Sequence, residues 1–189
     1  MNTLIARVSL VAALAVVPAI AAAQHSMENP KHEFGVDLGI TYNKTGSGCS
    51  IDCGSVQIGT PVDVRFGFVS SGPLSFEPRF TFGYITGGGD HVLTFTPDLN
   101  VLFRMGSSTA RKGMYLTAGA GIALTSASIQ GTSGSASQIS LNGGVGTRVP
   151  YESAAWRLEA FFRYNLENSG KGIPSSIDIG ARIGLSLWH

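Results

Sequence analysis

Eight stretches of alternating apolar and polar residues dominate this sequence. They cover 34–42, 58–68, 74–84, 93–104, 114–125, 139–149, 156–166 and 177–187. In the first stretch, for example, Phe34, Val36 and Leu38 alternate with Gly35 and Asp37. A period of two residues is the signature of a β-strand with two different faces, and a helical period fits none of the stretches comparably. The chain is therefore predicted to be all-β.

The length of these stretches favours a membrane protein. Each stretch is close to 11 residues long, whereas strands of soluble proteins usually have about 5 to 6 residues. At ~3.3 Å per residue and a tilt of about 40°, such a strand rises roughly 28 Å, close to the ~25 Å apolar band of a transmembrane barrel. No sequence stretch after residue 23 approaches the apolar length of a spanning helix. We therefore predict an eight-stranded antiparallel up-and-down transmembrane β-barrel.

The types of charged residue indicate which strand face lies inside the barrel. All lysines (Lys31, Lys44, Lys112 and Lys171) fall outside the eight stretches, and the polar strand faces carry arginine with carboxylates. Because the guanidinium pairs bidentately and stays charged, this composition suits a narrow enclosed space. The predicted lumen network consists of Asp37, Asp63, Arg65, Glu77, Arg79, Asp98, Arg104, Arg148, Arg157, Glu159, Arg163, Asp178 and Arg182. The alternative is a lipocalin-like soluble barrel whose polar face meets water.

The composition agrees with a closed polar interior. Only 13% of the residues are charged and 25 are glycine, against roughly 25% charged and about 7% glycine in ordinary soluble domains. Lipid-facing positions cannot carry charge, and inward glycines make room for long side chains. The formal net charge is +1 and the sequence has no Lys/Arg cluster, so nucleic acid is not an expected partner.

Aromatic residues and prolines mark positions along the predicted strands. Two interfacial girdles are expected on the outer face of the barrel. The first consists of Phe34, Phe68, Phe76, Phe103 and Trp156, and the second of Tyr42, Tyr84 and Tyr164. Pro61, Pro78 and Pro97 lie within predicted strands, where each removes a ladder hydrogen bond. We expect bulges or strand ends at these prolines.

The connections between strands alternate between the two ends of the barrel. Outward connections are expected at 44–55, 87–91, 126–137 and 167–175, with turns at 70–73, 105–113 and 150–155. The first outward connection holds Cys49 and Cys53, the sole cysteines of the chain. In an exported protein an even number of cysteines indicates a disulfide, with free thiols as the alternative.

Residues 1–23 have the layout of a secretory signal peptide. A short region ending at Arg7 precedes an apolar run that Pro18 interrupts, and three alanines stand before Gln24. We expect cleavage after residue 23 and a barrel domain at 24–189. An N-terminal membrane anchor is the alternative, but it would need roughly 20 apolar residues.

The C-terminal strand carries the most specific family signal. Arg182, Gly184, Leu187 and the terminal His189 match a spacing of polar residue, glycine and two hydrophobic or aromatic positions. In this respect the chain resembles the small OmpA-like/OmpX-like outer membrane β-barrel proteins of Gram-negative bacteria, whose members usually end in Phe. The resemblance implies an assembly signal at Gly184, Leu187 and His189. It also implies a monomer in the outer membrane, in contact with its lipid and lipopolysaccharide, the assembly machinery and periplasmic chaperones.

No constellation of residues indicates an enzyme. The four histidines are scattered, and Asp90–His91 is the single acid–histidine neighbour in a connection. No catalytic, cofactor or metal site is therefore predicted. We expect a non-enzymatic protein with a structural or surface-interaction role in the envelope. Two alternatives stay open: a small porin-like or OmpW-like transport barrel, and a lipid A-modifying barrel enzyme.

Overall fold

The structure, a computed structural model, describes residues 31–45, 54–57, 61–87, 90–129 and 131–188. Its strands are β1 (His32–Thr45), β2 (Gly54–Gln57), β3 (Val62–Val69), β4 (Leu74–Gly87), β5 (Asp90–Arg104), β6 (Gly113–Ile129), β7 (Thr132–Tyr151), β8 (Ala154–Asn165) and β9 (Ser176–Trp188). A short 3-10 helix, η2 (Ser169–Lys171), lies between β8 and β9. Within the described ranges, no helix is long and apolar enough to cross a membrane.

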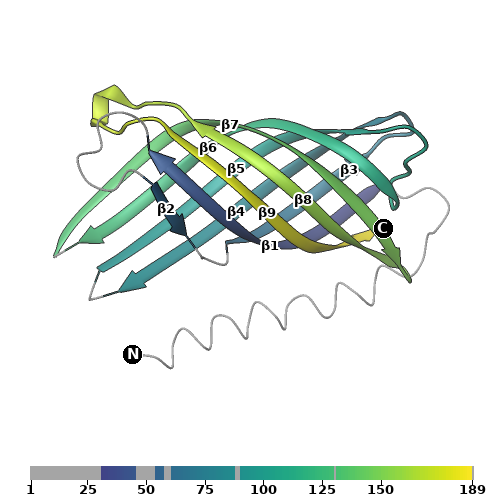
Figure 1. Cartoon of the computed structure of the whole chain (residues 1–189), viewed down its shortest axis with the longest axis horizontal. Coiled ribbons are helices and arrows are strands. Elements are labelled where there is room, and N and C mark those ends of the chain that lie inside the picture. The colour runs from purple at the N-terminus through teal and green to yellow at the C-terminus, as the bar shows by residue number, and fades with distance from the viewer. Residues whose placement is uncertain (1–30, 46–53, 58–60, 88–89, 130, 189) are drawn as a thin grey trace.

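Eight of these strands form a closed antiparallel barrel (Figure 1). Each strand from β3 to β9 pairs with its neighbour in sequence, and β1 pairs with both β3 and β9 to close the ring. The short strand β2 pairs with the last part of β1, beyond the point where β1 leaves β3. The predicted barrel is confirmed, and β2 is an addition that begins at the end of the expected connection 44–55 and continues to Gln57.

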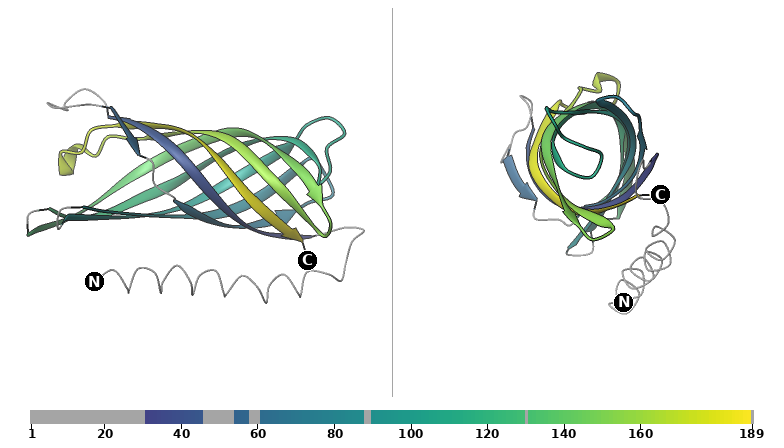
Figure 2. Two further views of the ribbon diagram at one scale, coloured as in Figure 1. Left: turned by 60° about the horizontal axis from the view of Figure 1, so that its bottom comes forward. Right: turned by 90° about the vertical axis from the view of Figure 1, so that its right-hand side faces the viewer.

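The strands are staggered around the ring. A path through hydrogen-bonded neighbours that starts at Gly35 on β1 returns to β1 at Thr45, ten residues further on. A stagger of ten residues over eight strands corresponds to a tilt of about 40°, and Figure 2 shows the strands running obliquely around the axis. This stagger decides which residues meet inside the barrel.

Burial is inverted relative to a soluble protein. Arg65 and Arg157 have no exposed surface, whereas Ile40 and Leu99 are 59% and 58% exposed. Apolar side chains cover the outer surface of every barrel strand, and charged and hydroxyl side chains fill the interior. An exposed apolar surface that encircles the molecule requires a lipid environment. The lipocalin-like alternative, with an apolar interior, is therefore wrong.

The end of the barrel where β1 begins and β9 ends is called here the terminal mouth, and the opposite end the loop mouth. Outward-facing aromatic rings gather near both. Phe68 and Phe76 are cross-strand neighbours near the terminal mouth, and Tyr84 lies opposite Leu93 towards the loop mouth. All three rings are exposed, as expected of interfacial girdles.

Two of the three prolines contradict our expectation. Pro61 precedes β3 and marks a strand end, as predicted. Pro78 and Pro97, however, lie inside β4 and β5, and the β3–β4 and β5–β6 registers are the same before and after them. Neither proline produces a bulge. Each proline lacks an N–H, so the pairing of Pro78 with β3 and of Pro97 with β6 is interrupted. The ladder between β4 and β5 is intact, and there Pro78 pairs with Leu99 and Pro97 pairs with Phe80.

The expected connections 87–91 and 126–137 are also wrong, because most of these residues belong to strands. The β4–β5 hairpin continues to Gly87 and Asp90, and the β6–β7 hairpin to Ile129 and Thr132. These strands project beyond β8, whose pairing with β7 starts at Ser140 (Figures 1 and 2). Both faces of such an extension meet water, so the apolar alternation that marks a strand is missing there. Conversely, β3 begins at Val62 and not at Ile58.

Introduction of a charge on the outer surface tests whether that surface faces lipid. Leu99 lies on the outer face of β5 between Leu93 and Phe103, so Leu99→Arg should lower the free energy of unfolding in lipid vesicles by about 2–4 kcal/mol. Met114→Arg, at the terminal end of the same face, should cost only about 0–1 kcal/mol. Urea titration followed by tryptophan fluorescence measures both. Equal, negligible effects would contradict a lipid-facing outer surface.

Candidate functional site: the charged lumen

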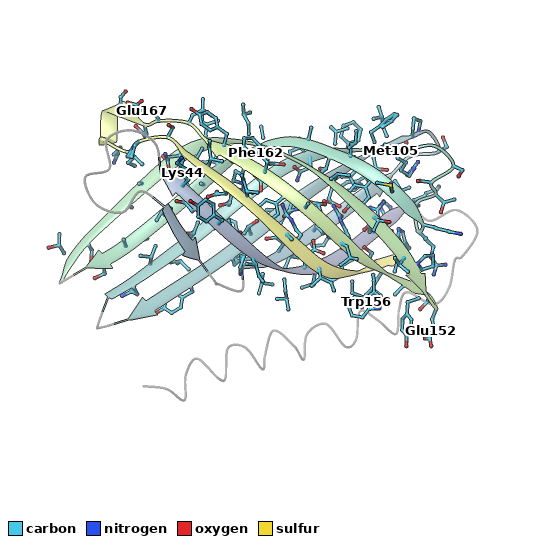
Figure 3. The ribbon with its side chains drawn as sticks, viewed as in Figure 1. Lys44, Met105, Glu152, Trp156, Phe162 and Glu167 are labelled. Atoms are coloured by element: carbon cyan, nitrogen blue, oxygen red, sulfur yellow. The ribbon has the colours of Figure 1, made fainter. Side chains whose placement is uncertain are left out.

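The barrel interior is filled by the charged side chains of the polar strand faces. Eleven of the thirteen predicted lumen residues are buried, and Arg163 and Asp178 are half-buried. The buried ones are Asp37, Asp63, Arg65, Glu77, Arg79, Asp98, Arg104, Arg148, Arg157, Glu159 and Arg182. Figure 3 shows polar atoms within the ribbon and Trp156 outside it. Alternation along each strand is sufficient to place these groups inside.

Two arginines and two glutamates form a ring at the centre of the lumen, called here the central ring. Arg157 contacts Glu77 through Nη1 and Glu159 through Nη2, each at 2.5 Å. Arg79 contacts the same carboxylates, Glu77 at 2.7 Å and Glu159 at 3.1 Å. Because β4 supplies Glu77 and Arg79 and β8 supplies Arg157 and Glu159, the central ring ties opposite walls of the barrel together.

Tyr115 on β6 completes the hydrogen bonding of the central ring. Its hydroxyl donates to Glu159 Oε2 at 2.7 Å and accepts from Arg157 Nε at 2.5 Å. The guanidinium groups of Arg157 and Arg148 lie over the Tyr115 ring, at 4.7 and 5.0 Å from its centroid. Cation–π contact with these two arginines and the hydrogen bonds of the hydroxyl therefore hold the side chain of Tyr115 in place.

A second cluster lies nearer the terminal mouth and centres on Arg65. Arg65 donates to both carboxylate oxygens of Asp37, at 2.7 and 3.0 Å, and to Glu33 at 2.5 Å. Glu33 also accepts from Arg148 at 2.6 Å and from Ser186 at 2.7 Å. Each of these carboxylates is thus satisfied by several donors, which offsets the cost of its burial.

Sequence reasoning missed Glu33. The first predicted strand began at Phe34, whereas β1 begins at His32 and directs Glu33 inward with only 3% of its surface exposed. The signal was available, since Glu33 stands two residues before Gly35 and shares its face. With Glu33 the seven lumen arginines face seven carboxylates instead of six. The interior is electrically balanced.

Towards the loop mouth the network becomes sparser. Arg182 pairs with Asp63 and approaches Glu159 at 3.2 Å, and Arg163 pairs with Asp98. A cavity of about 150 Å³ adjoins these groups, enough for roughly five waters. Asp178, which lines this cavity, accepts hydrogen bonds from Asn43 and Asn165. Among the described residues no basic group lies within 4 Å of Asp178.

Glycines provide the space that the long side chains occupy. A Cβ atom on Gly35 would lie 2.2 Å from Arg65 Cζ, and one on Gly146 would lie 2.1 Å from the Tyr115 hydroxyl. The high glycine content is thus partly a requirement of the packed lumen, as the sequence indicated.

The remaining predicted sites are only partly described. Cys49, Cys53, His189 and the signal segment 1–23 lie outside the described residues. Gly184 and Leu187 lie on β9, where they pair with Asp37 and Phe34 of β1 at the closing seam of the barrel. Their role as an assembly signal stays a prediction. Within the described part of the chain, no group of three His, Cys, Asp or Glu residues could hold a metal ion.

The closed ring of eight strands, the apolar exterior and the balanced charged lumen together define the fold class of the small outer membrane β-barrels. Solved structures of such proteins share the fold. Neisserial surface protein A (NspA) has a TM-score of 0.64 at 11% identity, covering 84% of this chain and 97% of that one. Ail of Yersinia pestis has a TM-score of 0.52 at 14% identity, covering 85% and 98%. A major outer membrane protein of Thermus thermophilus has 0.53 at 14%, covering 84% and 99%.

These similarities concern the fold. No family model matches the sequence, and no curated protein matches it. The architecture is thus shared at identities far below those at which a specific role carries over.

Proposed function

We propose that this chain is a non-enzymatic outer membrane protein with a structural or surface-interaction role in a Gram-negative envelope. In this proposal the signal segment 1–23 directs export, and the assembly machinery and periplasmic chaperones deliver the barrel to the membrane. The monomer then lies among outer membrane lipid and lipopolysaccharide. The terminal mouth faces the periplasm, as in barrels with an even number of strands.

The blocked lumen is the observation that carries this proposal. The central ring joins β4 to β8, Arg148 on β7 pairs with Glu33 on β1, and Arg163 on β8 pairs with Asp98 on β5, so ion pairs cross the interior in several directions. The cavity near the loop mouth adjoins Arg182 and Asp63, which belong to the same network. An eight-stranded lumen is just wide enough for side chains to fill. A role as a transport barrel is disfavoured for this reason.

The projecting strands support a role at the cell surface. The ends of β6 and β7 consist mainly of serine, threonine, alanine and glycine, and they pair with each other from Ile122–Ile139 to Ile129–Thr132. A hydrogen-bonded ribbon of this kind presents polar side chains in a defined arrangement beyond the membrane. A binding partner outside the cell would therefore contact this β6–β7 ribbon first.

Planar bilayer recording tests the proposal. We expect the purified protein to form no stable channels, because the central ring fills the lumen. Large, stable channels would contradict a blocked barrel and would favour the transport alternative. The double variant Glu77→Ser/Arg157→Ser removes one charge of each sign and should raise the conductance if the central ring is the block. Mass analysis of lipid A from cells with and without the protein tests the enzyme alternative.

A further inference from the structure

A large open cavity lies at the terminal mouth. Its volume is about 1150 Å³, and it is bounded by the start of β1, the β3–β4 turn and the β5–β6 loop. Figure 3 marks this end of the barrel with Met105 and Glu152. The cavity is separate from the smaller one near the loop mouth, which lies on the other side of the central ring.

The lining of this cavity is basic and rich in hydroxyl groups. Its basic residues are Lys31, His32, Arg104 and Arg111, and its hydroxyl groups belong to Ser70, Ser71, Ser108 and Thr109. The described lining residues include no aspartate or glutamate. Such a lining complements a negatively charged ligand.

Arg104 differs from the other lumen arginines. Each of the other six lies within 4 Å of at least one carboxylate, whereas among the described residues Arg104 has none in this range. Its guanidinium donates instead to Ser75 Oγ at 2.9 Å, to the Ser70 carbonyl at 2.8 Å and to the Gly72 carbonyl. Two of its five N–H groups keep no acceptor among the described residues. Arg104 is only 9% exposed, and a buried cation with no counter-ion among the described residues favours an anion beside it.

The β5–β6 loop shapes the cavity in advance of any ligand. Backbone hydrogen bonds join Met105 to Met114 and Thr109 to Lys112. Arg111 donates to the Glu152 carbonyl at 2.6 Å, and its guanidinium lies 5.4 Å from the centroid of the Trp188 ring. The loop is therefore attached to the β7–β8 turn and to the end of β9.

We propose that this cavity binds a phosphate group. Lys31, Arg104 and Arg111 line one space with basic groups, and the several acceptor oxygens of a phosphate suit such a lining better than the two oxygens of a carboxylate. Phe68 and His32, whose rings meet edge to face at 5.7 Å, extend the lining to the lipid-facing side of the barrel. The phosphate could therefore belong to a phospholipid headgroup or be free in solution. This inference is independent of the role proposed above.

Two probes distinguish these sources in an uncharged detergent. Inorganic phosphate is titrated by isothermal calorimetry, and water-soluble dihexanoyl phosphatidylglycerol is titrated in parallel. Saturable binding of inorganic phosphate indicates a free phosphate, and binding of the phosphatidylglycerol alone indicates a lipid headgroup. Absence of binding for both would overturn the proposal, as would equal binding of acetate at the same ionic strength.

Variants connect the binding to the cavity. Arg104→Gln should weaken binding at least tenfold, and Lys31→Gln, on an exposed residue whose loss leaves the barrel intact, should weaken it several-fold. Lys171→Gln, in η2 at the loop mouth, is the matched control and should bind like the parent protein. Heat-modifiable migration on a gel shows that each variant is folded. Unchanged binding in folded Arg104→Gln and Lys31→Gln would place the anion elsewhere and refute the site.

Discussion

Replacement of Arg157 with methionine is expected to lower the free energy of unfolding by about 3–5 kcal/mol. Arg157 has no exposed surface and contacts both Glu77 and Glu159 at 2.5 Å. Its removal takes a 2.5 Å partner from each of two buried carboxylates, Glu77 and Glu159, and the interior gains one uncompensated negative charge. The unfolding midpoint in urea, measured in lipid vesicles, should fall accordingly.

Two companion variants show whether the loss comes from charge balance. Arg157→Met/Glu77→Gln removes one charge of each sign and should recover much of the lost stability. Removal of one partner of a buried ion pair leaves an unpaired charge, and this costs more than removal of both partners. Arg163→Met removes a half-buried arginine whose one carboxylate partner among the described residues is Asp98, and it should cost less than half as much. Equal losses in Arg157→Met and Arg163→Met would contradict the assignment of the central ring as the main stabilising cluster.

The substitution Gly184→Ala is expected to prevent closure of the barrel. A Cβ atom at this position would lie 1.8 Å from Asp37 Oδ1 and 2.4 Å from the Val36 carbonyl oxygen. The carbonyl belongs to β1, so it cannot move without opening the β1–β9 seam, and displacement of Asp37 would break its two bonds to Arg65. A loss of more than about 3 kcal/mol, at or beyond the upper end of overpacking costs, is expected. The folded band on an unheated gel should disappear.

Gly39→Ala is the matched control at the same seam. Its Cβ would lie 3.4 Å from the Ala181 carbonyl oxygen, an ordinary contact distance, and this variant should fold. Refolding into lipid vesicles without any assembly machinery separates two roles of Gly184. Failure of Gly184→Ala in vesicles assigns it to packing at the seam. Normal folding in vesicles with failure in cells would assign it to the predicted assembly signal instead.

The side-chain face of each strand residue was predictable because alternation is a local property. Arg65, Arg79 and Arg157 were placed inside from their own neighbours in sequence, and the structure buries all three. The predicted strand boundaries were wrong where the alternation of apolar and polar residues ends. The projecting strands of the β6–β7 hairpin lack alternation because both faces meet water, and Glu33 was missed because the predicted first strand began two residues after the start of β1.

The proline expectations failed for a different reason. Pro78 removes a hydrogen bond towards β3, but the β4–β5 ladder continues through it to Leu99. In a closed barrel every strand has two neighbours, so one intact ladder is enough to keep the strand straight and in register. This redundancy is absent from the local rule that links proline to strand ends.

The sequence by itself determined that the chain forms a barrel of long strands, with arginine and carboxylates inside and apolar residues outside, because the period of two residues depends only on adjacent positions. The tertiary structure decided which charges meet. Arg79 and Glu159 are 80 residues apart in sequence, and their contact depends on a stagger that all eight pairings set together. The same stagger closes the seam at Gly184 and leaves Arg104, at the terminal mouth, with no carboxylate within 4 Å among the described residues. Such long-range matches follow from the geometry of the whole ring and are not encoded in any one strand.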